Sequence, residues 1–429
     1  MRFATITILQ ILLWTVLVAA LFTSLEWWIR PPVERGNFQS LQEYLTGQLK
    51  DAEKNRRIGS AALILLHKGA ITEVQLYEGS REDEIGSVKP EEKLYLLCSV
   101  SKAVTAWGIM KLVEDGKIGL NDPILPYLKR WRFPGSEQFR DSVTISQLLS
   151  HTSGLVERFG YSGFSLEEER QTPEESLQLP KDANMGEPHP AIIQYPPGSG
   201  MSYSSAGYTV LQILIEELTG KSFNEFMKEQ VLQPLGMKHA TYDVEELVAQ
   251  NRLWQLVPNY DSELGIHPPR KHTMMAGGSL YITPHEMALF LQAYFHEGFL
   301  PKTAIEQMLK PQPGTSESWA LGHEIYVNDQ TAFIAGHGGG AFPRTGASFR
   351  VNSSTGNAIA IMMTGGTEMI DPFMKTWTYW ETGLYDFDIR EVVHNRGKQT
   401  LIVTILGALV VAGWRIRKRK MKNSMSKIN

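Results

Sequence analysis

A strand-like apolar run meets a helical pattern in Leu94-Tyr-Leu-Leu-Cys-Ser-Val-Ser-Lys102. Ser99 and Lys102 stand three positions apart there, and on a helix such positions share a face with Cβ atoms about 5–6 Å apart. The amine can therefore reach the hydroxyl and take its proton, which a serine must lose to act as a nucleophile. The helix start also offers free backbone N–H groups to a developing negative charge. This spacing of serine and lysine is common on solvent-exposed helix faces, so a catalytic assignment needs evidence from other residues.

Three further segments place reactive side chains and glycines in turns. Tyr203 ends the segment Tyr195-Pro-Pro-Gly-Ser-Gly-Met-Ser-Tyr203, just before a predicted helix. The second segment is Ala276-Gly-Gly-Ser-Leu-Tyr-Ile-Thr-Pro-His-Glu, and the third is Gly336-His-Gly-Gly-Gly-Ala at the end of a predicted strand. With these motifs in this order, and with His151-Thr-Ser-Gly-Leu, the chain resembles the serine β-lactamase and penicillin-binding-protein superfamily. It is most similar to the branch that holds class C β-lactamases, D-alanyl carboxypeptidases, D-aminopeptidases and related esterases, over about residues 42–384.

The resemblance implies a catalytic role for three residues. Ser99 matches the nucleophile and Lys102 its neighbouring base. Tyr203 matches a tyrosine whose phenolate exchanges protons with the nucleophile and the leaving group. A phenol with a pKa of about 10 needs positive neighbours for that role. The implied reaction is acylation of Ser99 followed by hydrolysis of the acyl-enzyme, and it requires no metal and no other cofactor.

The glycine-rich strand is expected to bind the substrate. His337-Gly338-Gly339 stands where many members have Lys-Thr-Gly, and the resemblance implies that His337 donates a hydrogen bond to a substrate carboxylate or carbonyl. The amides of Ser99 and Gly340 would form the oxyanion hole, which typically contributes a few kcal/mol to catalysis.

Two positions depart from the family pattern. The usual Tyr-x-Asn motif ends here in Ser205, whose shorter hydroxyl would weaken any contact with a substrate amide. His337 replaces a lysine, which removes a permanent cation that would hold a β-lactam carboxylate. Both departures lower the expectation of efficient penicillin hydrolysis but leave acyl transfer in place.

The bulk composition excludes some classes of protein. The 429 residues suffice for one large domain or two modest ones. The net charge of -4 gives no reason to expect nucleic-acid binding. Cys98 is the single cysteine, so no intramolecular disulfide can form. Its position beside Ser99 allows a nucleophile role, but its apolar neighbours favour packing.

Both ends of the chain carry apolar runs. Residues 3–25 contain no charge and are followed by Trp27 and Trp28, which is typical of a membrane span with interfacial anchors. A cleaved signal peptide is the alternative. Residues 401–414 are apolar and the seven Lys or Arg of residues 415–427 follow, so a second span is expected, with an amphipathic core helix as its alternative. We therefore expect an N-terminal anchor at 1–27, an extracytoplasmic hydrolase domain at 28–398, a C-terminal span at 399–416 and a basic cytoplasmic tail at 417–429.

Between these ends the pattern predicts an α/β (α+β) chain. Residues 61–66 and 71–77 read as a β-hairpin. Helices are expected from Ser99 to Glu114, over 144–151, 205–218, 223–231, 283–295 and 371–380, and strands over 320–327, 333–335, 347–351 and 358–364. Strands at both ends suggest one sheet built from distant pieces, flanked by helices and accompanied by a helical lobe. Residues 157–190 read as a long loop, either a lid over the site or an inert insertion.

The sequence thus predicts a membrane-tethered serine hydrolase of the β-lactamase-like fold, with an antiparallel sheet. Its expected substrates are small molecules, peptides or esters, including D-amino-acid-containing cell-wall material, or an acylated peptide precursor. A β-lactamase is one alternative. A non-catalytic penicillin-binding or sensor protein is another, although Ser99, Lys102 and Tyr203 are all present and the basic tail is too short to hold a signalling domain.

Overall fold

The computed structural model describes residues 31–79, 92–157, 160–261, 265–384 and 386. The chain divides into two compact units, one of them Arg35–Gly383 and the other Met1–Glu34 together with Leu384–Asn429. The second unit lies almost entirely outside the described residues, as do both expected membrane spans. Among the residues described, no helix has the length and apolar character that a bilayer crossing requires. Arg35–Gly383 contains every catalytic motif found in the sequence.

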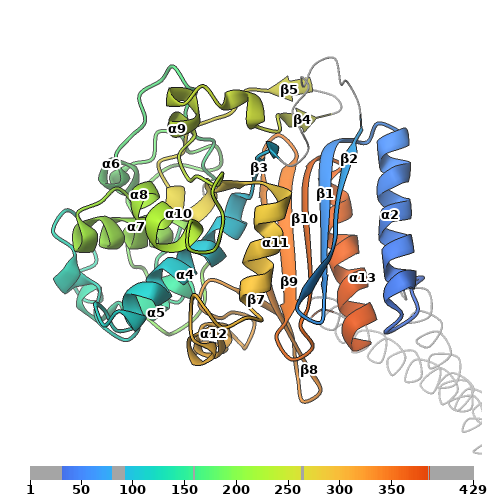
Figure 1. Cartoon of the computed structure of the whole chain (residues 1–429). Helices are drawn as coiled ribbons and strands as arrows, with labels where there is room; N and C mark the ends of the chain where they lie inside the picture. The colour runs from blue at the N-terminus through green and yellow to red at the C-terminus, as the bar shows by residue number, and fades with distance from the viewer. Residues whose placement is uncertain (1–30, 80–91, 158–159, 262–264, 385, 387–429) are drawn as a thin grey trace, which may run out of the picture. The chain divides into compact units, whose positions relative to one another are not determined.

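An antiparallel sheet forms the frame of this unit (Figure 1). In the described part of the chain its six strands follow the order β2-β1-β10-β9-β8-β7. They are β1 (Ile58–His67), β2 (Ala70–Glu78), β7 (Glu324–Asp329), β8 (Ala332–Ala341), β9 (Thr345–Asn352) and β10 (Asn357–Gly365). The pairing of β1 with β10, with Ala62 opposite Met362, joins strands from the two ends of the unit. The expectation of one sheet built from distant pieces is confirmed.

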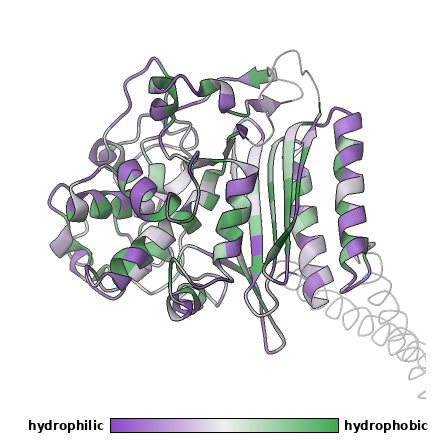
Figure 2. Cartoon of the chain, viewed as in Figure 1, coloured by the Kyte–Doolittle hydropathy of each residue, from purple (hydrophilic) through white to green (hydrophobic). Residues whose placement is uncertain are grey.

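Helices cover both faces of the sheet. The strands β1 and β10 are buried almost throughout, because α2 (Phe38–Lys54) and α13 (Ile370–Thr382) contact the sheet on one face and α11 (Pro284–Ala293) contacts it on the other (Figure 1). α2 buries a single stripe formed by Leu41, Leu45, Leu49 and Ala52. Figure 2 shows its hydrophilic residues along the rest of the helix. The edge strand β2 instead alternates between exposed and partly buried residues over its first six positions.

The helical lobe surrounds α4 (Ser101–Glu114). Most of α4 is buried, from Ser101 through Met110, so it forms the centre of the lobe and not its surface. The other helices are α5 (Ile145–Leu149), α6 (Pro173–Gln178), α7 (Ser205–Thr219), α8 (Phe223–Met227), α9 (Val244–Ala249), α10 (Met275–Gly278) and α12 (Lys302–Leu309). Short strand pairs join β3 (Tyr95–Leu96) to β6 (Tyr281–Ile282) and β4 (Asn259–Asp261) to β5 (Gly265–His267).

Most predicted elements are confirmed, with two corrections in the last part of the chain. The strand expected over 320–327 begins at Glu324, because Gly322 has a φ of +73° and turns the chain so that Trp319 pairs back with Glu324. The strand expected over 333–335 continues through Gly340 to Ala341, because its backbone pairs with β9 throughout.

Candidate active site

Ser99 lies in the turn that connects β3 to α4. Cys98 adopts a left-handed φ of +49°, and the 3-10 turn Cys98–Val100 then leads into the helix. Ser101 Oγ fixes this turn because it donates a hydrogen bond to Cys98 O at 2.6 Å and accepts one from Leu280 N at 3.0 Å. The nucleophile candidate is therefore held at the start of a buried helix.

Lys102 lies within reach of Ser99, as the spacing predicts. Its Nζ is 3.3 Å from Ser99 Oγ and 2.6 Å from Gly277 O, and neither acceptor carries a formal charge. The side chain is completely buried. Burial lowers the pKa of Lys102 to about 7, and the nearby charge of Glu157 acts in the opposite direction. A lysine with this pKa is partly neutral at neutral pH, which a general base requires.

Tyr203 lies beside both Ser99 and Lys102. Its ring is 4.4 Å from that of His151 and 5.7 Å from that of Trp319, and Lys102 Nζ lies 5.0 Å from its centroid. The residue is 39% exposed, but burial of its hydroxyl raises the pKa of Tyr203 well above its ordinary value, while a hydrogen bond with Ser99 lowers it. At rest Tyr203 is therefore a phenol that can pass a proton on, whereas Lys102 is better suited to receive the first one.

His337 lies on β8 and is 1% exposed. Its Nδ1 donates a hydrogen bond to Gly338 O at 2.6 Å and is 3.7 Å from Glu324 Oε1. Burial, together with the nearby charge of Lys102, lowers the pKa of His337 to about 3. The ring is thus neutral with its lone pair at Nε2, which is buried and has no hydrogen-bond partner among the described residues. The donation expected from the sequence would need a protonated ring.

The glycines of β8 let the strand lie against the nucleophile. A Cβ atom on Gly339 would be 2.5 Å from Ser99 N and 2.9 Å from Leu97 O, so position 339 has no room for a side chain. Gly340 follows and is exposed, and a Cβ on Gly338 would make ordinary contacts at 3.8 Å or more. The strand therefore brings backbone amides to the side of Ser99, where an oxyanion hole is expected.

Ser205 and Cys98 are less accessible than a substrate contact requires. Ser205 begins α7, is 8% exposed and donates its backbone N–H to Glu157 Oε1 at 2.5 Å. The motif position predicts that the Ser205 side chain contacts the substrate, but very little of this residue is exposed for such a contact. Cys98 is 3% exposed, and burial raises the pKa of its thiol to about 12. A buried protonated thiol fits the packing role.

A family model described as Beta-lactamase matches residues 38–382. The chain belongs to the β-lactamase family. Esterase EstB from Burkholderia gladioli is 31% identical over 330 residues, which cover 68% of this chain and 81% of that protein. Penicillin-binding protein 4 from Amycolatopsis lactamdurans is 26% identical over 337 residues, covering 72% and 81% of the two chains.

Solved structures of the family have the same fold. The octameric penicillin-binding protein homologue from Pyrococcus abyssi aligns with a TM-score of 0.60 and 21% identity, over 81% of this chain and 78% of that one. The chain is thus a member of the serine β-lactamase and penicillin-binding-protein superfamily of serine hydrolases, with the β-lactamase-like fold.

Glu157 is a charged residue of the candidate active site that the sequence analysis missed. Its carboxylate accepts hydrogen bonds from Ala206 N at 2.6 Å and Tyr161 Oη at 3.2 Å, besides the one from Ser205 N. It follows the His151-Thr-Ser-Gly-Leu motif by two positions. An acidic residue two positions after a motif that borders the site was the feature of the sequence that could have identified it.

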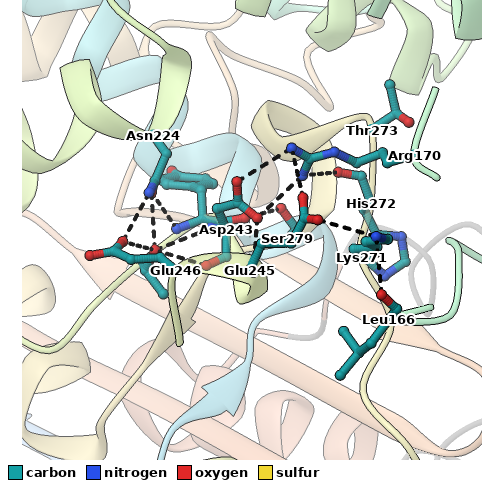
Figure 3. Close-up of polar contacts among 12 residues, drawn as sticks. Leu166, Arg170, Asn224, Asp243, Glu245, Glu246, Lys271, His272, Thr273 and Ser279 are labelled. Atoms are coloured by element: carbon teal, nitrogen blue, oxygen red, sulfur yellow. Dashed lines mark hydrogen bonds and ion pairs between the residues drawn. The ribbon is translucent and has the colours of Figure 1, made fainter. Parts of the chain in front are cut away.

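The described part of the segment 157–190, which leaves out residues 158–159, is anchored to the helical lobe. Figure 3 shows that Arg170 contacts both Asp243 and Glu245, with ion pairs of 3.3 and 3.2 Å. Lys271 contacts Glu245 at 3.1 Å and Leu166 O at 3.2 Å. Leu166 packs against the apolar cluster that includes Cys98. The segment therefore has its own fixed contacts beside the Ser99 turn.

Proposed function

We propose that this chain is a membrane-anchored serine hydrolase that works through an acyl-enzyme on Ser99. The observation that carries the proposal is the approach of the buried Lys102 Nζ to Ser99 Oγ at 3.3 Å, beside the Tyr203 hydroxyl. A serine, a base that can be neutral and a proton carrier make a complete acyl-transfer centre. That completeness argues against a non-catalytic sensor.

The geometry supports the following sequence of proton transfers. Neutral Lys102 takes the proton of Ser99 as Oγ attacks the substrate carbonyl. The amides of Ser99 and Gly340 stabilise the negative charge on the carbonyl oxygen. Tyr203 gives its proton to the leaving group and recovers one from Lys102. A water molecule then attacks the acyl carbonyl and gives a proton to Lys102, and Lys102 returns this proton to Ser99 Oγ as the ester bond breaks.

The substrates that fit best are esters or peptides whose leaving group is uncharged. His337 is neutral and its Nδ1 lies 3.7 Å from the Glu324 carboxylate, so this part of the strand offers a poor partner for a carboxylate. Cell-wall-related peptides that contain D-amino acids, or an acylated peptide precursor, fit when the group beyond the scissile bond is not anionic. A β-lactamase activity is the alternative. The similarity to an esterase supports the proposal that the substrates are esters.

The proposed tethers at 1–27 and 399–416 would hold the hydrolase outside the cytoplasm, with the basic tail inside. Within Arg35–Gly383 the first and last helices lie together, because Gly36 N donates to Trp380 O at 3.3 Å and Trp380 Nε1 donates to Asn37 O at 2.9 Å. Both flanking segments therefore start from one place on the unit. Protease treatment of intact cells tests the topology, since external cleavage of the tail would contradict it.

Labelling of the full chain with a fluorophosphonate and a fluorescent penicillin tests the chemistry. We expect fluorophosphonate label on the wild type and none on Ser99→Ala. Label that persists in Ser99→Ala would refute the nucleophile assignment. A stable penicillin adduct would favour the penicillin-binding alternative, and rapid penicillin turnover would favour the β-lactamase.

A further inference from the structure

Glu157 is bound to the first turn of α7 from a distant part of the sequence. Its two carboxylate oxygens accept the N–H groups of Ser205 at 2.5 Å and Ala206 at 2.6 Å. The N-cap residue Ser204 already serves the next free donor, since its Oγ accepts from Gly207 N at 3.1 Å. The helix start therefore has both a local cap and a long-range carboxylate.

This contact fixes the backbone that carries Tyr203. Ser204, which follows Tyr203 directly, donates its backbone N–H to His151 Nδ1 at 3.1 Å and its hydroxyl to Glu157 at 3.4 Å. The His151 ring in turn lies against the Tyr203 ring. Glu157 and His151 thus both hold the backbone directly after Tyr203, and both come from the segment that starts at the end of α5.

A helix cap alone does not require this carboxylate. In α11, Thr283 and Glu286 form a capping box in which the acid is local to the helix. Bringing a charge from 48 positions away into a partly buried place costs desolvation free energy. Such a charge is retained more readily where an opposite charge lies close by.

Lys102 is the opposite charge. Burial raises the pKa of Glu157 and lowers that of Lys102 to about 7, and the attraction between the two charges acts against both shifts. The titratable groups that act on one or other of this pair from the surrounding elements are Cys98, His151, Tyr161, Tyr203, Tyr208 and His337. None of these six groups is a carboxylate, and Glu157 is the carboxylate whose charge acts on Lys102.

We infer that Glu157 is a positioning residue for the proposed Ser99 centre: its carboxylate fixes the turn that presents Tyr203 and balances the charge of Lys102. The inference rests on the proposed function. Its consequence is that removing the charge of Glu157, while keeping an oxygen acceptor, changes the pH at which the base becomes active.

The test is the pH profile of kcat/KM of the full chain for a p-nitrophenyl ester, for the wild type and Glu157→Gln. With the carboxylate gone, Lys102 loses its proton more easily, so the acid limb of Glu157→Gln is expected to move to lower pH by at least about 0.5 unit. Glu286→Gln is the matched control, because that carboxylate caps backbone N–H groups of His239 and Ala240 instead. It should lower the unfolding temperature and leave the limb in place.

Tyr161→Phe provides a second variant should Glu157→Gln fail to fold. It removes a donor whose hydrogen bond lowers the pKa of Glu157. Less of the carboxylate is then charged, so the limb should move in the same direction by a smaller amount. A foldable Glu157→Gln whose pH profile coincides with the wild type, or a limb that moves equally in Glu286→Gln, would overturn the inference. A wild type that takes no fluorophosphonate label at Ser99 would instead refute the proposed function, and this is seen before any variant is compared.

Discussion

Gly339→Ala tests how closely β8 has to approach the nucleophile. The added Cβ would lie 2.5 Å from Ser99 N, 2.9 Å from Leu97 O and 3.0 Å from Val100 N, all of them backbone atoms that no side-chain rotation can move away. A tolerable carbon–nitrogen contact requires the strand and the Ser99 turn to separate by about 0.5 Å or more. Overpacking of this kind costs about 1–3 kcal/mol of stability. Displacing an oxyanion donor costs about 100-fold in rate.

The assay is kcat/KM for a p-nitrophenyl ester, with thermal unfolding measured on the same samples. We expect Gly339→Ala to lose about 100-fold in kcat/KM and to unfold at a lower temperature. Gly338→Ala on the other face of the strand, where the new Cβ has 3.8 Å to its nearest neighbour, should lose about twofold at most. Activity of Gly339→Ala within about threefold of that of Gly338→Ala would refute the close approach as a requirement for catalysis.

Three other predictions follow from the same structure. Because the neutral form of Lys102 appears as the pH rises through its pKa of about 7, kcat/KM should reach half its maximum near that pH and level off above it. A flat profile between about pH 5 and 9 would contradict this, and Lys102→Arg, which stays protonated, should lose about 100-fold or more. Arg170→Ala breaks the ion pairs with Asp243, so limited proteolysis should cut residues 157–190 faster, with about 1 kcal/mol of stability lost; an unchanged cleavage rate would show that the ion pairs do not anchor the segment. Arg350→Met removes the buried donor that Met374 O and Thr378 Oγ1 share, and urea unfolding should report about 1–3 kcal/mol less stability, whereas a more stable variant would refute the value assigned to these hydrogen bonds.

The parts of the fold that could be predicted from the sequence are those specified by neighbouring residues. The hairpin of β1 and β2 follows from two apolar runs around Lys68-Gly69, and both turn residues have a positive φ. The full length of β8 could not be predicted, since Gly336–Gly340 has no strand propensity. Its extended form is imposed by pairing with β9, with Gly339 opposite Ala347.

The site residues divide in the same way, into those specified by neighbouring residues and those specified by distant segments. The Ser99–Lys102 pair is encoded in a local spacing, so it was predictable before any fold was known. The contact of Glu157 with α7 is not, because its partners are 48 and 49 positions away. The low pKa of Lys102 and the high pKa of Tyr203 result from burial by residues that come from several segments, and composition carries no trace of that burial.

The joined ends of Arg35–Gly383 have a mechanical consequence. A Cβ on Gly383 would lie 2.9 Å from the guanidinium carbon of Arg35, so the polypeptide enters and leaves the unit at a single point. Tension applied through both flanking segments would load the pair α2 and α13 and would bypass β8 and the Ser99 turn. Because its two ends lie together, the unit Arg35–Gly383 should fold when it is inserted as a whole into a loop of another protein. A short linker between its ends should allow a circular permutant, with new termini in the Asp329–Thr331 hairpin, to keep its fold.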